Sequence, residues 1–229
     1  MSDGGGWRRA LLGAAAGCVG LVIGLLSLAP EAVSLLYVAR PLATLLLLVL
    51  AATTREPLSP SYRALVTAGL AATLVGDVLL MVPADRFLAG RLAFLVAHGC
   101  LLAAFASRAP LLRHRLGVIA YAAVATVVLA LVLPAVGGAL RFVLVTSVVV
   151  LALMAAQAVS WMLEEPASSA ARFGAIGAAC LVASDALLAL DRFVLVIPAR
   201  DLLVLLPFWL GLALLALSVR RPPPPALRL

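Results

Sequence analysis

Long apolar stretches separated by short polar breaks run along almost the whole chain. Eight such stretches cover residues 10–29, 33–52, 62–82, 87–106, 111–133, 140–163, 171–190 and 198–219. Each holds about 20 residues, the length an α-helix needs to cross the hydrocarbon core of a bilayer. Because the breaks are short, consecutive helices should lie antiparallel. The pattern therefore predicts an all-α, polytopic integral membrane helical bundle of about eight transmembrane helices, formed by residues 1–229 as a single transmembrane domain.

The composition supports this class. The chain is 65% hydrophobic with a mean hydropathy of +1.20, whereas soluble domains are about 45–50% apolar. The first run is too long for a signal peptide and is followed by further spans, so we expect a retained first helix. Residues 220–229 form a proline- and arginine-rich tail that cannot continue the last helix, and we expect this tail to be disordered.

The positive charge of the chain indicates orientation and not nucleic-acid binding. The net charge is +7, and all 17 basic residues are arginines, placed at the ends of apolar runs without forming a basic face. With the N-terminus inside, the inner segments hold 11 arginines and the outer side 6, namely Arg40, Arg86, Arg91, Arg141, Arg192 and Arg200. Since arginine is enriched in cytoplasmic loops, both termini are predicted to be cytoplasmic. Arginine without lysine, together with the Ala, Leu and Val bias, indicates a GC-rich bacterial genome and hence a bacterial inner membrane.

Two carboxylates inside apolar runs are the main functional signal. Asp77 is followed by a pair of leucines and then by Asp85-Arg86-Phe87, and Asp185 repeats this order 108 residues later, ending in Asp191-Arg192-Phe193. A charged group inside lipid costs roughly 2.5–3.5 kcal/mol on insertion scales, which makes it a functional-site candidate. The repeat is also compatible with two parallel four-helix halves, a pattern known in membrane folds.

The predicted orientation places the unusual residues at similar depths. Asp77 and Asp185 each lie five residues before the outer end of a run, so both should sit about 7–8 Å below that end. Arg40 enters from the same side and should sit about 10 Å deep. Thr44 lies one turn further along the same face, and His98 lies deeper, near the midplane.

Each of these residues also has a structural interpretation. The two acids could form interhelical hydrogen bonds, Arg40 could snorkel to the interface, His98 could be a hydrogen-bonded core histidine, and Asp191 could cap a helix end. In the functional interpretation, two carboxylates in different settings divide into a proton donor and a base, and the fork of an arginine binds a carboxylate or a phosphate. With two histidines and no paired cysteine spacing, no metal and no cofactor are expected.

Several motifs together resemble the YhhN-like lysoplasmalogenase family over residues 33–219. They are Arg40-Pro41-Leu42-Ala43-Thr44, Gly76-Asp77, Phe87–Gly90 with Phe94 and His98, and Ser184-Asp185 with Phe193. Members of that family are eight-helix membrane enzymes that cleave the vinyl ether bond of lysoplasmalogens, releasing a fatty aldehyde and a glycerophospho-base. The chain departs from the family at Arg40, where lysine is usual, at Asp191, where asparagine is common, and in Phe208–Leu212, which lacks the usual hydroxyl and amide groups.

The resemblance implies that Asp77 and Asp185 are the catalytic pair. We expect the substrate, a lysophospholipid taken from the membrane, to contact the other polar positions noted above, which are Arg40, Thr44, His98, Ser184 and Asp191. A lipid or small-solute transporter, or a non-catalytic membrane protein, is the main alternative, because intramembrane acids and a parallel repeat fit it as well. An intramembrane aspartyl protease is disfavoured, since Leu74 stands where the G-x-G-D motif has glycine.

Overall fold

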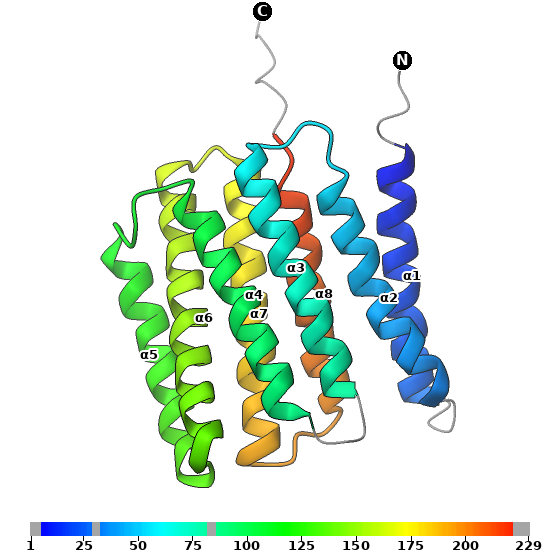
Figure 1. Cartoon of the computed structure of the whole chain (residues 1–229), viewed down its shortest axis with the longest axis vertical. Helices are drawn as coiled ribbons and strands as arrows, with labels where there is room; N and C mark the ends of the chain where they lie inside the picture. Colours follow the sequence, from blue (N-terminus) through cyan, green and yellow to red (C-terminus); the bar gives the residue numbers. More distant parts are fainter. Residues whose placement is uncertain (1–5, 29–32, 82–85, 222–229) are drawn as a thin grey trace, which may run out of the picture.

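The helices form one antiparallel bundle, shown by a computed structural model that describes residues 6–28, 33–81 and 86–221 (Figure 1). Within these ranges the elements are α1 (Gly6–Leu28), α2 (Val33–Ala52), α3 (Pro60–Met81), α4 (Phe87–Ala106), α5 (Arg115–Val132), the 3-10 turn η1 (Leu133–Ala135), α6 (Gly138–Glu164), α7 (Ser169–Phe193) and α8 (Arg200–Ser218). The beginning of α1 and the end of α8 lie at the same end of the bundle, as an even number of antiparallel helices requires. The prediction of an all-α polytopic bundle is confirmed.

Six of these helices, α3 to α8, are long and apolar enough to cross a membrane. The described part of α2 adds a shorter apolar helix, Tyr37–Ala52. Large apolar side chains such as Leu116 and Phe142 are more than three-quarters exposed, which suits a surface that faces lipid. The chain is therefore an integral membrane protein, while the membrane-spanning role of α1 and of the whole of α2 stays a prediction.

Glycine pairs let two pairs of helices approach closely. A Cβ atom on Gly76 of α3 would lie 3.2 Å from the carbonyl oxygen of Gly90 in α4, and one on Gly90 would lie 3.3 Å from that of Gly76. Gly177 of α7 and Gly211 of α8 meet in the same way, with corresponding distances of 3.0 and 2.9 Å. In lipid, no hydrophobic driving force holds helices together, so they associate through close van der Waals packing. Small residues at the contacts allow that close approach.

The packing of the helices follows a similar order in the two halves of the chain. Within each half, the third and fourth helices (α3 with α4, α7 with α8) form the tightest pair. Across the halves, α4 packs on α6 and α8 packs on α2. The pair α3–α4 thus corresponds to α7–α8, and α4–α6 corresponds to α8–α2, as expected for two parallel four-helix halves. It also places the ends of α3 and α7, and the beginnings of α4 and α8, at one end of the bundle (Figure 1).

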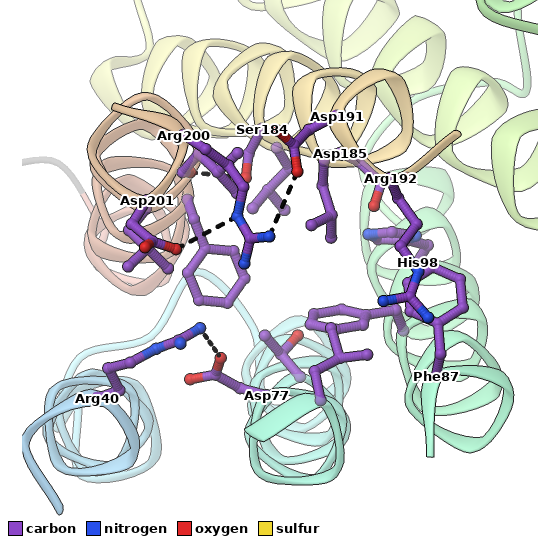
Figure 2. Close-up of a pocket in the computed structure, with 18 residues that line it drawn as sticks. Arg40, Asp77, Phe87, His98, Ser184, Asp185, Asp191, Arg192, Arg200 and Asp201 are labelled. Atoms are coloured by element: carbon purple, nitrogen blue, oxygen red, sulfur yellow. Dashed lines mark hydrogen bonds and ion pairs between the residues drawn. The ribbon is translucent and has the colours of Figure 1, made fainter. Parts of the chain in front are cut away.

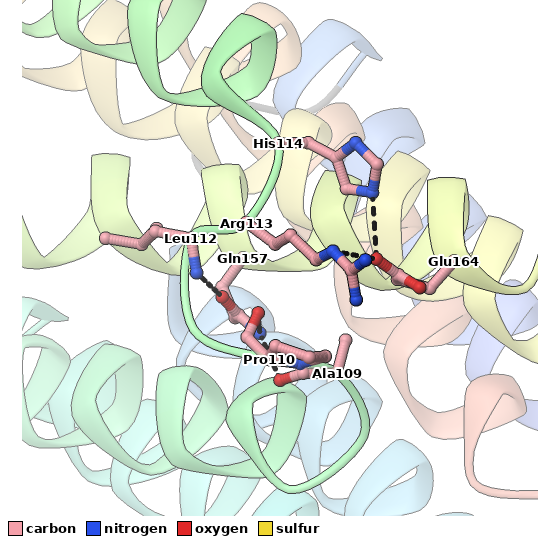
Figure 3. Close-up of polar contacts among 7 residues, drawn as sticks. All are labelled: Ala109, Pro110, Leu112, Arg113, His114, Gln157 and Glu164. Carbon is pink, nitrogen blue, oxygen red and sulfur yellow. Dashed lines mark hydrogen bonds and ion pairs between the residues drawn. The ribbon is translucent and has the colours of Figure 1, made fainter.

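A buried glutamine holds the connection between α4 and α5 (Figure 3), which lies at the opposite end of the bundle (Figure 1). The Gln157 amide of α6 donates from Nε2 to the carbonyl of Ala109 at 2.9 Å, and its Oε1 accepts from the backbone N–H of Leu112 at 2.7 Å. Nearby, His114 Nε2 lies 3.1 Å from Glu164 Oε1. Gln157 and Glu164 of α6 thus bind both backbone and side-chain groups of this loop.

The chain beyond α8 remains ordered for a short distance. Arg220 forms an isolated bridge with Pro57, and the backbone N–H of Arg221 donates to the carbonyl of Glu56 at 3.0 Å. The rest of the tail expected to be disordered, residues 222–229, lies outside the described residues.

Candidate active site

A pocket opens where α3 and α7 end and α4 and α8 begin (Figure 2). Its space, counted with the open mouth, is about 980 Å³. Residues from α2, α3, α4, α7 and α8 line it: Arg40, Thr73, Asp77, Leu80, Phe87, Phe94, His98, Leu181, Ser184, Asp185, Leu188, Asp191, Arg192, Arg200, Asp201, Val204, Leu205 and Phe208. The structure thus brings six of the seven predicted site residues to one place.

Asp77 is buried in the wall of this pocket and paired with Arg40. Arg40 Nη2 of α2 donates to Asp77 Oδ1 at 3.2 Å (Figure 2), and the Asp77 side chain is 4% exposed. The other carboxylate oxygen, Oδ2, has no hydrogen-bond partner among the described residues, nor does Arg40 Nε. Asp77 follows Gly76 directly, so the close approach of α3 to α4 sets its position. Both partners therefore retain hydrogen-bonding capacity for another group.

Asp185 has a different partner, which the sequence did not reveal. The two terminal nitrogens of the Arg91 guanidinium in α4 donate to its carboxylate, Nη1 to Oδ1 and Nη2 to Oδ2, the latter at 2.9 Å. The Arg91 side chain is 1% exposed. The interpretation of Arg91 as an outer topology signal is therefore wrong, because the side chain points into the bundle and not toward the interface. A signal was present, since Arg91, Phe94 and His98 are spaced to share one helix face.

His98 forms part of the deeper wall. Its ring stacks near that of Phe94 with centroids 6.3 Å apart, and Phe94 in turn meets Phe208 of α8 edge-on at 6.1 Å. His98 is buried, and its Nδ1 has no hydrogen-bond partner among the described residues. The deep part of the pocket thus combines aromatic walls with one unsatisfied polar atom.

Charged residues at the mouth order the segment between α7 and α8. Asp191 accepts a hydrogen bond from the backbone N–H of Ile197 at 3.0 Å and pairs with Arg200 at 3.3 Å. Arg200 also reaches Asp201 at 3.4 Å, and Arg192 lies over the ring of Phe87, 4.9 Å from its centre. Asp191 therefore lines the pocket and also ties the segment after α7 and the first residue of α8 to the end of α7.

Ser184 and Thr44 are less open to a ligand. The Ser184 hydroxyl donates to the carbonyl of Val204 at 2.8 Å, which joins α7 to α8 at the edge of the pocket. Thr44 is fully buried, its hydroxyl has no partner among the described residues, and it does not line the pocket. The shared helix face with Arg40 did not bring Thr44 into the site, because α2 packs that part of its face inside the bundle.

The pocket offers acid–base groups in two settings. Asp185 has both oxygens occupied by a guanidinium, whereas Asp77 has one oxygen occupied and one free. Among the described residues, no group of three His, Cys, Asp or Glu side chains lies close enough to hold a metal ion. In this arrangement Asp77 can donate or accept a proton close to the carboxylate of Asp185. The arginines that line the pocket can bind an anion.

A buried and a partly buried carboxylate–guanidinium pair at one end of an apolar bundle define a polytopic membrane protein with a charged pocket. The model of the YhhN family matches residues 35–219, a range that includes every residue lining the pocket, and the chain belongs to this family. The resemblance seen in the sequence is thereby confirmed. Searches of curated proteins and of solved structures found no match.

The buried pair of Arg91 and Asp185 predicts a characteristic pattern of stability. Arg91→Met and Asp185→Leu should each lower stability by about 3–5 kcal/mol, because each leaves one buried charge without its partner. The double variant should recover most of that loss, since two apolar groups of similar size replace the pair. Thermal unfolding of the purified proteins in detergent measures all four states of this cycle. Additive losses in the double variant would show that the two side chains do not depend on each other.

Proposed function

We propose that the protein hydrolyses the vinyl ether bond of a lysoplasmalogen within the membrane. The observation that supports this most strongly is the pairing of Asp77 and Asp185 with different arginines in one pocket of a YhhN-family chain. The substrate has one hydrocarbon chain and a phosphate head group. Its hydrolysis needs only water and acid–base groups. Aromatic and aliphatic walls suit the chain, and arginines at the mouth suit the phosphate.

Vinyl ether hydrolysis begins with a proton. Asp77, which has an oxygen free of partners, donates a proton to the β-carbon of the vinyl ether, and an oxocarbenium ion forms. The carboxylate of Asp185 stabilises this cation electrostatically. Asp77, now a carboxylate, takes a proton from the water that adds to the cation, and this restores its acid form. The hemiacetal then breaks its C–O bond to give the aldehyde, and the proton of its hydroxyl passes to the departing glycerol oxygen.

The remaining polar residues have supporting parts in this proposal. Arg40 lines the pocket beside Asp77 and binds the phosphate while keeping its contact with the acid. His98 offers its free Nδ1 to the glycerol or to the attacking water. Ser184 and Asp191 hold α8 and the α7–α8 segment in place, and Thr44 supports the packing of α2 beneath Arg40.

The arginine distribution supports a cell-membrane location with both termini in the cytoplasm. Arg91 is buried in the core with Asp185, which leaves Arg40, Arg86, Arg141, Arg192 and Arg200 as outer arginines in the topology count. The excess of arginine on the side of the termini is therefore larger than the sequence suggested. In this orientation the pocket opens toward the outer face of a bacterial inner membrane.

Aldehyde release by the purified protein tests the proposal. Wild-type protein should convert a lysoplasmalogen to a fatty aldehyde and a glycerophospho-base in equal amounts. Asp77→Asn and Asp185→Asn should each lower turnover at least about a hundredfold, within the range for acid–base groups. Glu165→Gln, a carboxylate-to-amide change at the opposite end of the bundle, is the matched control and should keep full activity. A transporter or lipid-binding protein would return the substrate unchanged, and near-normal turnover in either Asp variant would contradict the two-carboxylate mechanism.

Arg40 should act mainly on substrate binding. Arg40→Lys keeps the positive charge and should change KM no more than severalfold. Arg40→Leu should raise KM by about tenfold to a hundredfold, matching a lost charge-assisted hydrogen bond of about 1.5–3 kcal/mol. Steady-state kinetics with correctly inserted variants separates this from an effect on kcat. A reduced kcat with unchanged KM in Arg40→Leu would show that Arg40 serves Asp77 alone and does not bind the phosphate.

A further inference from the structure

The mouth of the pocket carries an excess of negative charge where α7 ends and α8 begins. Asp191, in the last turn of α7, and Asp201, in the first turn of α8, both contact Arg200, at 3.3 and 3.4 Å (Figure 2). All three residues line the pocket. Two carboxylates share one guanidinium, so one negative charge of this group is left without a counterion inside it.

The two carboxylates differ in how much of their binding capacity is used. The Asp191 side chain is 9% exposed, its Oδ1 accepts from the backbone N–H of Ile197 at 3.0 Å, and its Oδ2 faces Arg200 Nη1. The Asp201 side chain is 44% exposed, and its Oδ1 lies 3.4 Å from Arg200 Nε. Asp201 is therefore the acid of this group that is open to a cation entering the pocket.

A place for an anion lies on the same side of the pocket. Arg40 belongs to α2, which packs on α8, and Figure 2 shows Arg40 and Asp201 on one side of the opening. Arg40 Nε has no hydrogen-bond partner among the described residues. A phosphate at Arg40 would leave a cation attached to it by a short linker within the region of Asp201.

The aromatic rings of the pocket do not form a cage for a quaternary ammonium. The rings among the described lining residues are those of Phe87, Phe94 and Phe208. The guanidinium of Arg192 already covers Phe87, and Phe94 and Phe208 are buried and packed edge to face against each other. A quaternary ammonium has no N–H group and is recognised by aromatic cages, whereas a primary ammonium has three N–H donors, as in lysine. The mouth therefore suits a cation that donates hydrogen bonds.

We propose that Asp201 binds the primary ammonium of a head group whose phosphate lies at Arg40. The site then prefers a phosphoethanolamine head group, which donates a charge-assisted hydrogen bond to the carboxylate, over the trimethylated phosphocholine. This inference rests on the proposed function for the identity of the lipid. Asp201 determines specificity and takes no part in the proton transfers.

A series of N-methylated head groups separates hydrogen bonding from charge. The probes are 16-carbon alkyl ether lysophospholipids, which lack the double bond and are not hydrolysed, with an amino group that carries no, one, two or three methyl groups. Each probe keeps one positive charge on nitrogen, while the N–H donors fall from three to none. Their dissociation constants are measured for wild type, for Asp201→Asn, and for Asp201→Ala in case the amide variant does not insert.

Glu165→Gln is the matched control. Glu165 is exposed to a similar extent as Asp201, and its carboxylate also lies 3.4 Å from an arginine, Arg108. It does not line the pocket. The control thus removes an equivalent ion pair away from the ligand.

The expected result is a preference that disappears with the carboxylate. In wild type the dissociation constant should rise about tenfold from the primary to the trimethylated probe, the low end for a lost charge-assisted hydrogen bond. Asp201→Asn should weaken binding of the primary amine about tenfold and leave the trimethylated probe within about twofold, so that the series becomes flat. Glu165→Gln should match wild type with every probe.

Three results would overturn the proposal. They are a flat series in wild type, a preference that persists in Asp201→Asn, and an equal loss for all four probes in Asp201→Asn. The last result would show that Asp201 only complements the dipole of α8 and orders Arg200. Because the probes are not cleaved, a methylation-dependent affinity without aldehyde release from vinyl ether lipids would support the role of Asp201 while refuting the hydrolase. Aldehyde release with a flat series would do the reverse.

Discussion

The ion pair between Arg91 and Asp185 ties the two halves of the bundle together at the level of the pocket. α4 packs on α3 and α6, and α7 packs on α6 and α8, so the pair joins one tight helix pair to the other. Two charges in a low-dielectric interior are tolerated only when geometry and hydrogen bonding are good. The bidentate contact meets that condition. It links α4 to α7 through Asp185, which also lines the pocket.

The pocket follows from how the helix ends are brought together around this pair. Gly76 with Gly90, and Gly177 with Gly211, allow α3–α4 and α7–α8 to pack closely. Asp77, the residue after Gly76, is carried into the pocket by the first of these contacts. The two acids then differ through their arginines, since Arg91 occupies both oxygens of Asp185 and Arg40 occupies one oxygen of Asp77. Similar sequence surroundings have thus produced two unlike carboxylates.

Much of this could be predicted from the sequence. Apolar runs of about 20 residues gave the helices because lipid leaves the backbone few alternatives, and Asp77 and Asp185 stood out because charges are rare inside such runs. Arg91 could not be assigned, because an arginine four residues into a run normally snorkels, and its partner lies 94 residues away on another helix. The sequence placed Thr44 on the same face of α2 as Arg40. In the structure Thr44 is buried between helices and does not line the pocket.

The position of a bound, uncleaved substrate analogue tests the central claim most directly. An experimental structure with a 16-carbon alkyl ether lysophosphocholine should show a phosphate oxygen about 3 Å from the Arg40 guanidinium. The carbon atoms next to the ether oxygen should lie in contact with the carboxyl groups of Asp77 and Asp185. A lipid bound with its head group at the opposite end of the bundle, or a pocket in which the ether oxygen is remote from both acids, would contradict a hydrolytic site built on these two carboxylates.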